Sequence, residues 1–259
     1  MKFKNVLWVI FALFFGFALL VNCVHKKNKE SSGQKKAINE VALETSILNT
    51  LTPMEKEKDW TLLFDGKTLN GWRGFKSDSI GPGWIVDRGN LMSLGKGGDL
   101  GGDIITDKEF GNFNLKLEWK LSKGGNSGIL FHVLEGNYPT VYATGPEYQL
   151  IDDIGYPGKL EDWQTCGANY AMNVPENPKI KPALEWNTSE LIVNGPHVIQ
   201  YLNGSKVVEY DMWTNEWKQR VQNGKWKDYP GYGLAKKGHI SLQDHGSKIW
   251  FRNIKIKEL

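Results

Sequence analysis

The sequence predicts an all-β sandwich of two antiparallel sheets, and three observations lead to this prediction. Short segments of alternating apolar and polar residues follow one another from Asp59 to Leu259, as expected of half-buried strands. Turn signals such as Asp65-Gly66 and Asn203-Gly204 separate these segments, in a chain that holds 29 Gly and 11 Trp. After Pro53 no segment shows a convincing helical pattern. We therefore expect one domain over residues 59–259, without repeats or a second core.

Residues 1–22 have the pattern of a lipoprotein signal peptide. Lys2 and Lys4 precede an unbroken apolar run that is too short for a comfortable membrane span. Cys23 stands where such a precursor would be cleaved and acylated, although Asn22 is larger than the usual residue before the cysteine. We expect lipid on Cys23 to anchor an exported protein that faces the periplasm or sits at the outer membrane of a Gram-negative bacterium. An uncleaved anchor and a cut elsewhere are the alternatives.

Residues 23–58 have the polar, charge-rich composition of a tether. Within it, Ala37 to Leu51 carries apolar residues at roughly helical spacing, which is compatible with a short helix that Pro53 would end. With Cys23 acylated, Cys166 has no partner, so we expect no internal disulfide and interpret Cys166 as a small buried hydrophobe. The formal net charge of +3 is too close to neutral to indicate nucleic acid or an acidic membrane surface as a partner.

The strands of the predicted domain can be placed in order along the chain. They are expected at 60–64, 69–72, 84–86, 90–92, 103–106, 113–120, 125–132, 145–153, 185–193, 197–202, 205–210, 239–243 and 248–257. The glycine-rich stretch at 95–102 lacks the spacing of a phosphate-binding loop. Residues 154–182 read as a long loop, and residues 213–234 interrupt the strands. This last segment is either a lid or short helix near the site, or a surface insertion packed by its own aromatic residues.

Three of these strands carry rows of short hydrogen-bonding side chains. Glu147 and Gln149 alternate with Tyr148 and Leu150, so the two pairs point to opposite faces of the sheet. The same alternation gives two further polar rows, which comprise Asn126, Gly128 and His132 on one strand and Ser241, Gln243 and His245 on the other. We expect the three rows to form one concave polar surface. The alternative for any single row is an ordinary solvated sheet face.

Several motifs, in this order and spacing, resemble the 3-keto-disaccharide hydrolase domain family over nearly the whole of 59–259. They are Trp60 to Gly66 with Leu69-Asn-Gly-Trp72, Gly125-Asn-Ser-Gly128, Glu147-Tyr-Gln149 with Asp152, Glu185-Trp-Asn187, Leu202-Asn-Gly204, Gly238 to Gly246, and Phe251-Arg-Asn-Ile254. The resemblance implies a concanavalin A-like, or laminin-G-like, jelly-roll sandwich. It also implies an exported lipoprotein that cleaves glycosides previously oxidised to a ketone at sugar C3, by hydrolysis or by elimination. The family usually has Arg near the position of His132.

A ketone at C3 acidifies the C2 proton, so cleavage requires a base, an acid and a hydrogen-bond donor for the developing enolate. Glu147 and His245 are the candidate base and acid, in either order. The candidate substrate-binding residues are Asn126, His132, Gln149, Asp152, Asp153, Trp186, Gln243 and Arg252. Structural roles are the alternatives for several of them: His132 as a satisfied sheet histidine, Asp152 and Asp153 as a turn cap, and Trp186 as a core residue.

The sequence is compatible with a bound metal ion and with two other carbohydrate-related functions. The residues of metal-ligand type are Glu147, Asp152, His132, His239 and His245, which would suffice for a single divalent ion, although their spacing is not compact. A non-catalytic, lectin-like carbohydrate-binding module would use the same amide and aromatic contacts. A conventional jelly-roll glucanase is disfavoured, because the paired carboxylates of a Glu-x-Asp-x-Glu strand do not occur in this sequence.

Overall fold

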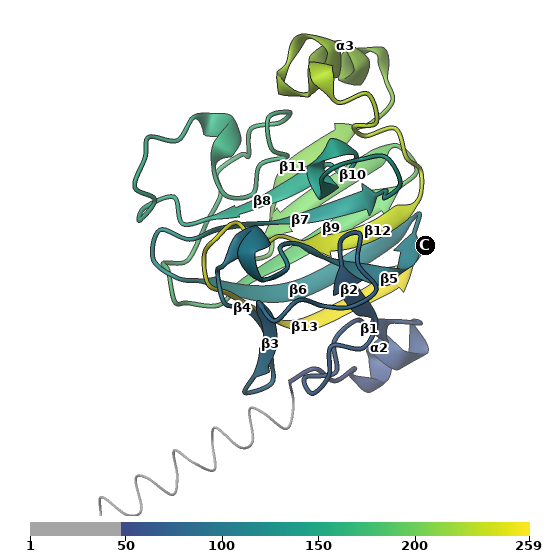
Figure 1. Ribbon diagram of the computed structural model, residues 1–259. Coiled ribbons are helices and arrows are strands. Elements are labelled where there is room, and N and C mark those ends of the chain that lie inside the picture. The colour runs from purple at the N-terminus through teal and green to yellow at the C-terminus, as the bar shows by residue number, and fades with distance from the viewer. Residues whose placement is uncertain (1–47) are drawn as a thin grey trace, which may run out of the picture. The chain divides into compact units, whose positions relative to one another are not determined.

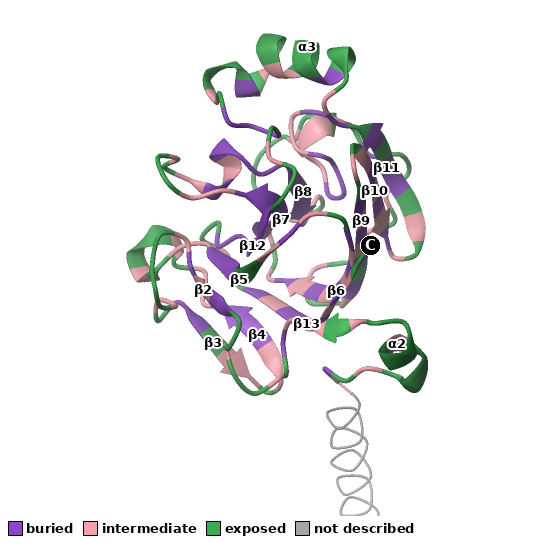
Figure 2. Cartoon of the chain, turned by 90° about the vertical axis from the view of Figure 1, so that its right-hand side faces the viewer, coloured by how far each residue is buried: buried purple, intermediate pink, exposed green. Residues whose placement is uncertain are grey.

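The structure, a computed structural model, describes residues 48–259, whose strands form two antiparallel sheets packed face to face (Figure 1, Figure 2). One sheet has the order β11 (Ser205–Asp211), β10 (His197–Leu202), β9 (Asn187–Asn194), β6 (Phe113–Leu121), β13 (Ile249–Glu258), β4 (Asn90–Ser93) and β3 (Trp84–Asp87), with β1 (Thr61–Leu62) also paired to β13. The other has the order β2 (Trp72–Gly74), β5 (Ile104–Phe110), β12 (Gly238–Leu242), β7 (Asn126–Val133) and β8 (Glu147–Ile151). The predicted all-β sandwich is confirmed.

Short helices join the strands at the edges of the sandwich. They are α2 (Pro53–Glu57), α3 (Asn215–Asn223) and the 3-10 turns η1 (Gly97–Leu100), η2 (Val141–Ala143), η3 (Asp162–Gln164) and η4 (Lys225–Asp228). Within residues 48–259, no helix has the length and apolar character needed to cross a bilayer.

Two hairpins close with two-residue turns, and one of these is the predicted Asn203-Gly204 turn. Asn203 and Gly204 join β10 to β11 with φ of 49° and 81°, the left-handed pair that a type I′ turn requires. Arg88 and Gly89 join β3 to β4 in the same way, with φ of 49° and 78°. Local turn chemistry therefore sets the register of β3 with β4, and that of β10 with β11 up to a register shift between Gln200 and Tyr201.

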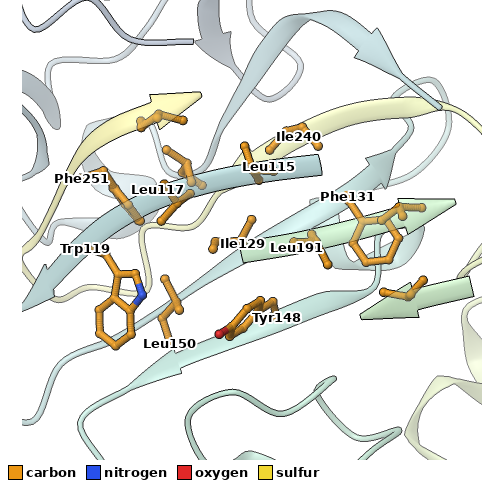
Figure 3. Packing of buried hydrophobic residues seen from close by; sticks show 14 of the residues in the cluster. Leu115, Leu117, Trp119, Ile129, Phe131, Tyr148, Leu150, Leu191, Ile240 and Phe251 are labelled. Carbon is orange, nitrogen blue, oxygen red and sulfur yellow. The ribbon is translucent and has the colours of Figure 1, made fainter. Parts of the chain in front are cut away.

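The hydrophobic core lies between the two sheets and follows the alternation read from the sequence (Figure 3). In β6 the buried Leu115, Leu117 and Trp119 alternate with half-buried polar residues. From the facing sheet, Tyr148 and Leu150 of β8 are 0% exposed. Burying one such large apolar side chain contributes roughly 1.5–3 kcal/mol. Because these side chains fix which face of each strand turns inward, they also fix the outward direction of the intervening polar residues.

Pro53 begins a helix instead of ending one, which corrects the sequence interpretation. In α2 it occupies the first turn, where its missing N–H costs nothing, and Thr52 and Glu55 form a reciprocal capping box. The sequence pattern had suggested a stop because proline is equally common just beyond a helix end.

The compact unit begins at Leu48, so residues 48–58 pack with the sandwich although they were assigned to the tether. Asn49 and Asn253 of β13 exchange two hydrogen bonds, in which each backbone N–H donates to the other side-chain oxygen at 2.6 and 2.8 Å. The predicted signal peptide, Cys23 and residues 37–47 of the possible helix lie outside the described residues. Residues 48–51, where that helix would end, form a turn and irregular chain instead of helix.

Residues 213–234, called the insertion below, contain α3 and η4, which lie beyond one end of the sandwich (Figure 1). Stacked aromatic rings pack α3 and η4 against β11. Trp217 stacks on Tyr210 of β11 and on Tyr232, and Tyr232 stacks on Trp226. The insertion closes on itself, because Trp213 Nε1 donates to the Gly233 carbonyl at 2.7 Å. The expected short helix is present, and the insertion is packed by its own aromatic residues.

Candidate functional site

A polar pocket of about 230 Å³ opens on the face of the five-stranded sheet that turns away from the core. Its lining residues are Asn126, Tyr142, Glu147, Gln149, Tyr170, Lys225, Trp226, Gln243 and His245. The structure therefore brings together five residues that the sequence singled out, from β7, β8 and the end of β12. The other four come from η2, the long loop after β8, and the insertion.

Glu147 is directed into the pocket by its neighbours along and across the sheet. Tyr148 beside it enters the core, so alternation turns Glu147 to the opposite face. Gly128 on β7 leaves room for the carboxylate, since a Cβ there would stand 2.5 Å from Glu147 Oε1. On the other side, Tyr170 N–H donates to the Glu147 carbonyl at 2.9 Å. The Glu147 carboxylate can therefore take this position only because Gly128, the glycine of the Asn-Ser-Gly motif, has no side chain.

The electrostatic environment of Glu147 suits proton transfer near neutral pH. The residue is 6% exposed, and this burial raises the pKa of its carboxyl to about 8. The Lys225 ammonium lowers that pKa and the Asp103 carboxylate raises it. Burial also raises the pKa of Asp103, to about 6, although the Asp244 N–H bonded to it opposes this. A carboxyl with a raised pKa that lines a pocket, as Glu147 does, is typical of catalytic sites.

Three buried amides surround the carboxylate with unused hydrogen-bonding capacity. The side-chain oxygens of Asn126, Gln149 and Gln243 are buried and have no hydrogen-bond partner within residues 48–259. The Gln149 amide nitrogen donates to the Gln164 carbonyl at 3.2 Å, and the Gln243 N–H donates to the Gly128 carbonyl at 3.0 Å. Buried polar atoms are rarely left unpaired, because each costs about 1–3 kcal/mol. Such a cluster indicates a hydroxyl-rich ligand.

His245 follows β12 and lies exposed at the rim, whereas Glu147 lies buried in the pocket. Tyr142, Tyr170 and Trp226 supply an aromatic wall, with the rings of Tyr142 and Tyr170 at 6.5 and 6.2 Å from Trp226. These aromatic residues and Lys225 were not identified from the sequence as site residues. The one available signal was the Trp-rich composition of the insertion, which suggested a lid without saying which side chains face the pocket.

His132 lies elsewhere because β7 bulges. His239 pairs with Val133 while Ser241 pairs with Leu130, so β7 has one residue more than its partner there, and His132 takes φ of 53°. The bulge breaks the alternation on which the prediction depended. His132 Nε2 instead bonds the Gly111 carbonyl at 2.9 Å, and burial lowers the pKa of the ring. His132 is therefore a buried sheet histidine, as in the structural alternative, with Nε2 bonded and Nδ1 without a hydrogen-bond partner within residues 48–259.

Asp152 and Asp153, which follow β8, accept hydrogen bonds from the backbone of two loops. Asp152 Oδ2 accepts the Gly124 N–H at 2.8 Å, and Asp153 Oδ1 accepts the Cys166 N–H at 2.9 Å. Neither aspartate is among the residues that line the polar pocket. Cys166 is fully buried, and burial raises the pKa of its thiol. The aspartates therefore have structural roles, as the alternative proposed, but they bind the backbone of distant loops instead of capping their own turn. The burial of Cys166 fits its interpretation as a small buried hydrophobe.

Arg252 belongs to β13 of the other sheet, and Trp186 lies directly before β9 of that sheet. The Arg252 guanidinium carbon stands 4.0 Å from the centre of the Trp186 ring, and Arg252 Nε donates to Glu118 Oε2 on β6 at 2.7 Å. Both residues are absent from the lining of the polar pocket. Their motifs in the sequence therefore reflect a cation–aromatic contact on the eight-stranded sheet.

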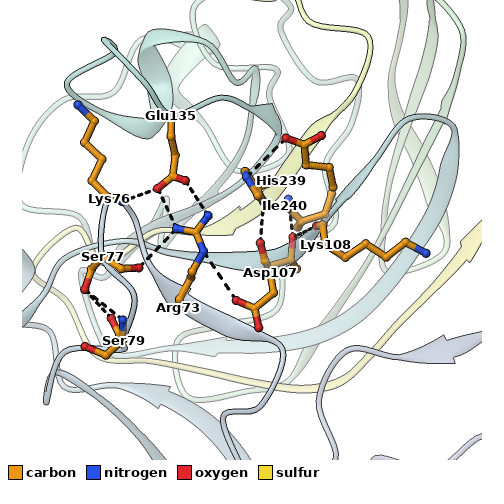
Figure 4. Close-up of polar contacts among 11 residues, drawn as sticks. Arg73, Lys76, Ser77, Ser79, Asp107, Lys108, Glu135, His239 and Ile240 are labelled. Carbon is orange, nitrogen blue, oxygen red and sulfur yellow. Dashed lines mark hydrogen bonds and ion pairs between the residues drawn. The ribbon is translucent and has the colours of Figure 1, made fainter.

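The histidines and carboxylates considered as metal ligands are dispersed. His239 Nδ1 bonds the Thr106 carbonyl at 2.7 Å, close to the Arg73–Glu135 pair that is bonded at 2.8 and 2.6 Å (Figure 4). Of the five residues considered, Glu147 and His245 alone share the polar pocket. In the part of the chain that the structure describes, no three His, Cys, Asp or Glu residues are grouped so that they could hold a metal ion.

Comparisons with known proteins cover nearly all of the described residues. Residues 59–257 match the family described as the 3-keto-alpha-glucoside-1,2-lyase-like domain. A relative from Bacteroides thetaiotaomicron, named 3-keto-disaccharide hydrolase, is 34% identical in an alignment 277 residues long. The alignment covers 93% of this chain and 94% of the relative. Two solved structures of candidate glycosyl hydrolases from Parabacteroides distasonis are also similar. The first is 44% identical with a TM-score of 0.77, over 82% of this chain and 99% of its own. The second is 30% identical with a TM-score of 0.60, over 78% and 100%.

Proposed function

The chain belongs to the 3-keto-alpha-glucoside-1,2-lyase-like domain family, and we propose that it cleaves the glycosidic bond of a 3-keto-glycoside in the polar pocket. The resemblance read from the sequence motifs is confirmed, and the chain is a glycoside-cleaving enzyme. The observation that supports the pocket as the site is Glu147: a buried carboxyl with a raised pKa, which shares the pocket with three amide side chains whose oxygens have no hydrogen-bond partner within residues 48–259. A carbohydrate is the ligand that these amides fit.

The positions of Glu147 and His245 give each a role in the proposed reaction. The buried Glu147 carboxylate takes the C2 proton, and the C–H electron pair becomes an enolate on the C3 oxygen. The enolate then forms a C1–C2 double bond as the C1–O bond breaks, and the leaving oxygen takes a proton from His245. An exposed acid at the rim suits a leaving group that extends towards solvent. Addition of water to the double bond would make the net reaction a hydrolysis.

The size of the pocket matches one sugar ring. Pockets for drug-sized ligands have volumes of roughly 300–1,000 Å³, and this one measures about 230 Å³. The oxidised ring would occupy it, with the second sugar or other aglycone outside. A conventional retaining glucanase needs two carboxyl groups about 5–5.5 Å apart. Glu147 provides the one carboxyl group among the lining residues of this pocket.

The test is a chromatographic assay of the purified protein on 3-keto-glucosides beside their unoxidised parents. We expect cleavage of the keto substrates alone, because without the ketone the C2 proton is not acidic. Binding of both sugars with turnover of neither would contradict the proposal and favour the lectin-like module. Cleavage of the unoxidised parents would favour the glucanase.

A further inference from the structure

Lys225 is the one lysine or arginine among the residues that line the polar pocket. It belongs to η4 of the insertion and reaches the pocket from outside the sheet. Its Nζ donates to the Tyr170 hydroxyl at 3.0 Å and stands 4.1 Å from the centre of the Tyr170 ring. The ring of its neighbour Trp226 is 5.3 Å from the same ammonium. Two aromatic residues therefore hold the cation at the pocket wall.

The ammonium has no ion-pair partner but acts on the buried carboxylate. Within residues 48–259, Lys225 forms no salt bridge, in contrast to the lysines that pair with a carboxylate, such as Lys108, Lys116, Lys206 and Lys255. Its charge favours the ionised form of Glu147. A cation that is fixed by aromatic contacts and free of a carboxylate partner can interact with a negative charge that forms on a ligand.

We propose that Lys225 stabilises the enolate oxygen that forms on the substrate when Glu147 removes the C2 proton. This inference rests on the proposed function. In the proton transfer, Glu147 becomes neutral while an equal negative charge appears on the C3 oxygen. The negative charge thus stays within the pocket and near the ammonium, which loses one anionic neighbour and gains another. Lys225 is exposed to solvent, and its advantage is that the contacts with Tyr170 and Trp226 hold the ammonium in place before the enolate forms. A cation positioned in advance needs little reorganisation when the negative charge appears.

The insertion is built so that Lys225 keeps its place. The adjacent Trp226 is 1% exposed, and its ring stacks on Tyr232 at 4.2 Å. Trp226 Nε1 donates to the Tyr170 carbonyl at 3.3 Å, which ties η4 to the loop that runs beside Glu147. The position of the ammonium is therefore set by the packing of the next residue, and not by the flexible lysine side chain alone.

The test compares Lys225→Met with Lys227→Met in the full chain. Lys227 lies in the same short helix, is exposed and does not line the polar pocket. Two rates are measured: cleavage of a 3-keto-glucoside, and exchange of the C2 proton of 3-keto-1,5-anhydroglucitol in D₂O by NMR. The second compound has no exocyclic leaving group at C1, so exchange of its C2 proton reports enolate formation without loss of an aglycone. We expect Lys225→Met to lower kcat and the exchange rate by roughly 10²–10³-fold, with Lys227→Met near the unmodified protein.

A second variant separates charge from structure. In Lys225→Ala, added methylammonium should restore part of the exchange rate, because it can supply the missing cation; Lys227→Ala should not respond. The proposal is overturned if folded Lys225→Met keeps its kcat and exchange rate, if it raises only KM, or if methylammonium restores nothing in folded Lys225→Ala. Failure of the proposed function looks different, since the unmodified protein itself would then neither cleave the keto substrate nor exchange the C2 proton.

Discussion

Glu147 owes both its proposed chemistry and a cost in stability to the same burial. Its ordinary pKa of 4.5 is raised to about 8 in the folded protein by loss of solvent, with Lys225 opposing and Asp103 adding to the shift. A base with a pKa near the working pH is well matched to proton abstraction. The cost arises because an ionised carboxylate is poorly solvated in that position.

Replacing Glu147 should therefore change activity and stability in opposite directions. Glu147→Gln should lower kcat/KM by about 10²–10⁴-fold, the usual contribution of a general base. The unmodified protein should gain activity as pH rises through about 8, where Glu147 ionises. The measurement is the initial rate on a 3-keto-glucoside across pH. A folded Glu147→Gln with the full rate would remove this residue from the mechanism.

The stability effect follows from proton linkage. Because the pKa is higher folded than unfolded, stability that is present below pH 4.5 is lost as pH rises to about 8. Glu147→Gln cannot ionise, so its melting temperature should exceed that of the unmodified protein by an amount that grows over this interval. Thermal melts at several pH values check this. A constant difference from pH 4.5 to 8 would mean that the carboxyl is not buried in solution.

His245 should behave as an acid at the rim of the pocket. His245→Gln should lower cleavage by about 10²–10⁴-fold but leave folding intact, because the side chain is exposed. The loss should be smaller for a substrate whose leaving group needs no protonation, such as a nitrophenyl 3-keto-glucoside. Equal losses on both substrates would assign His245 to another step.

Gly128 offers a way to move the carboxylate without removing it. A Cβ at Gly128 would lie 2.5 Å from Glu147 Oε1 and 3.0 Å from its Cδ, so Gly128→Ala should displace the carboxyl group. We expect a rate loss of about 10²-fold, as for a reacting group misplaced by roughly 1 Å. Gly98→Ala is the control, since a Cβ there meets no atom within 4 Å. Equal rates for the two variants would contradict the placement.

At the scale of elements, the sequence predicts what depends on local chemistry. Asn203-Gly204 could be recognised as a hairpin because only such residues adopt both left-handed conformations readily. Alternation identified Glu147, Gln149 and Gln243 as outward-facing residues for the same local reason. The bulge that turns His132 aside depends on how β7 pairs with β12, a long-range register that no short segment encodes.

At the scale of the whole molecule, the pocket depends on segments that only the fold brings together. Lys225 and Tyr170 lie far from β8 in sequence, yet Tyr170 pairs with Glu147 through the backbone and holds Lys225 through its hydroxyl. No periodicity relates the insertion to β8. The sequence therefore suggests a lid but does not show that Lys225 and Trp226 line the pocket beside Glu147. The jelly-roll fold itself was predictable, because its strands repeat one pattern many times.

The anchoring of the molecule is also a whole-molecule property, and we propose that Cys23 is acylated and becomes the mature N-terminus. The proposal rests on the sequence of residues 1–23, with its basic start, short apolar run and cysteine. Mass spectrometry of the membrane-extracted protein should show a lipid-modified Cys23, and Cys23→Ala should abolish this modification. Cys166→Ala is the matched control: its buried thiol lies inside the sandwich, so membrane attachment should persist. Attachment that survives Cys23→Ala, or a protein that still begins at Met1, would instead indicate an uncleaved anchor.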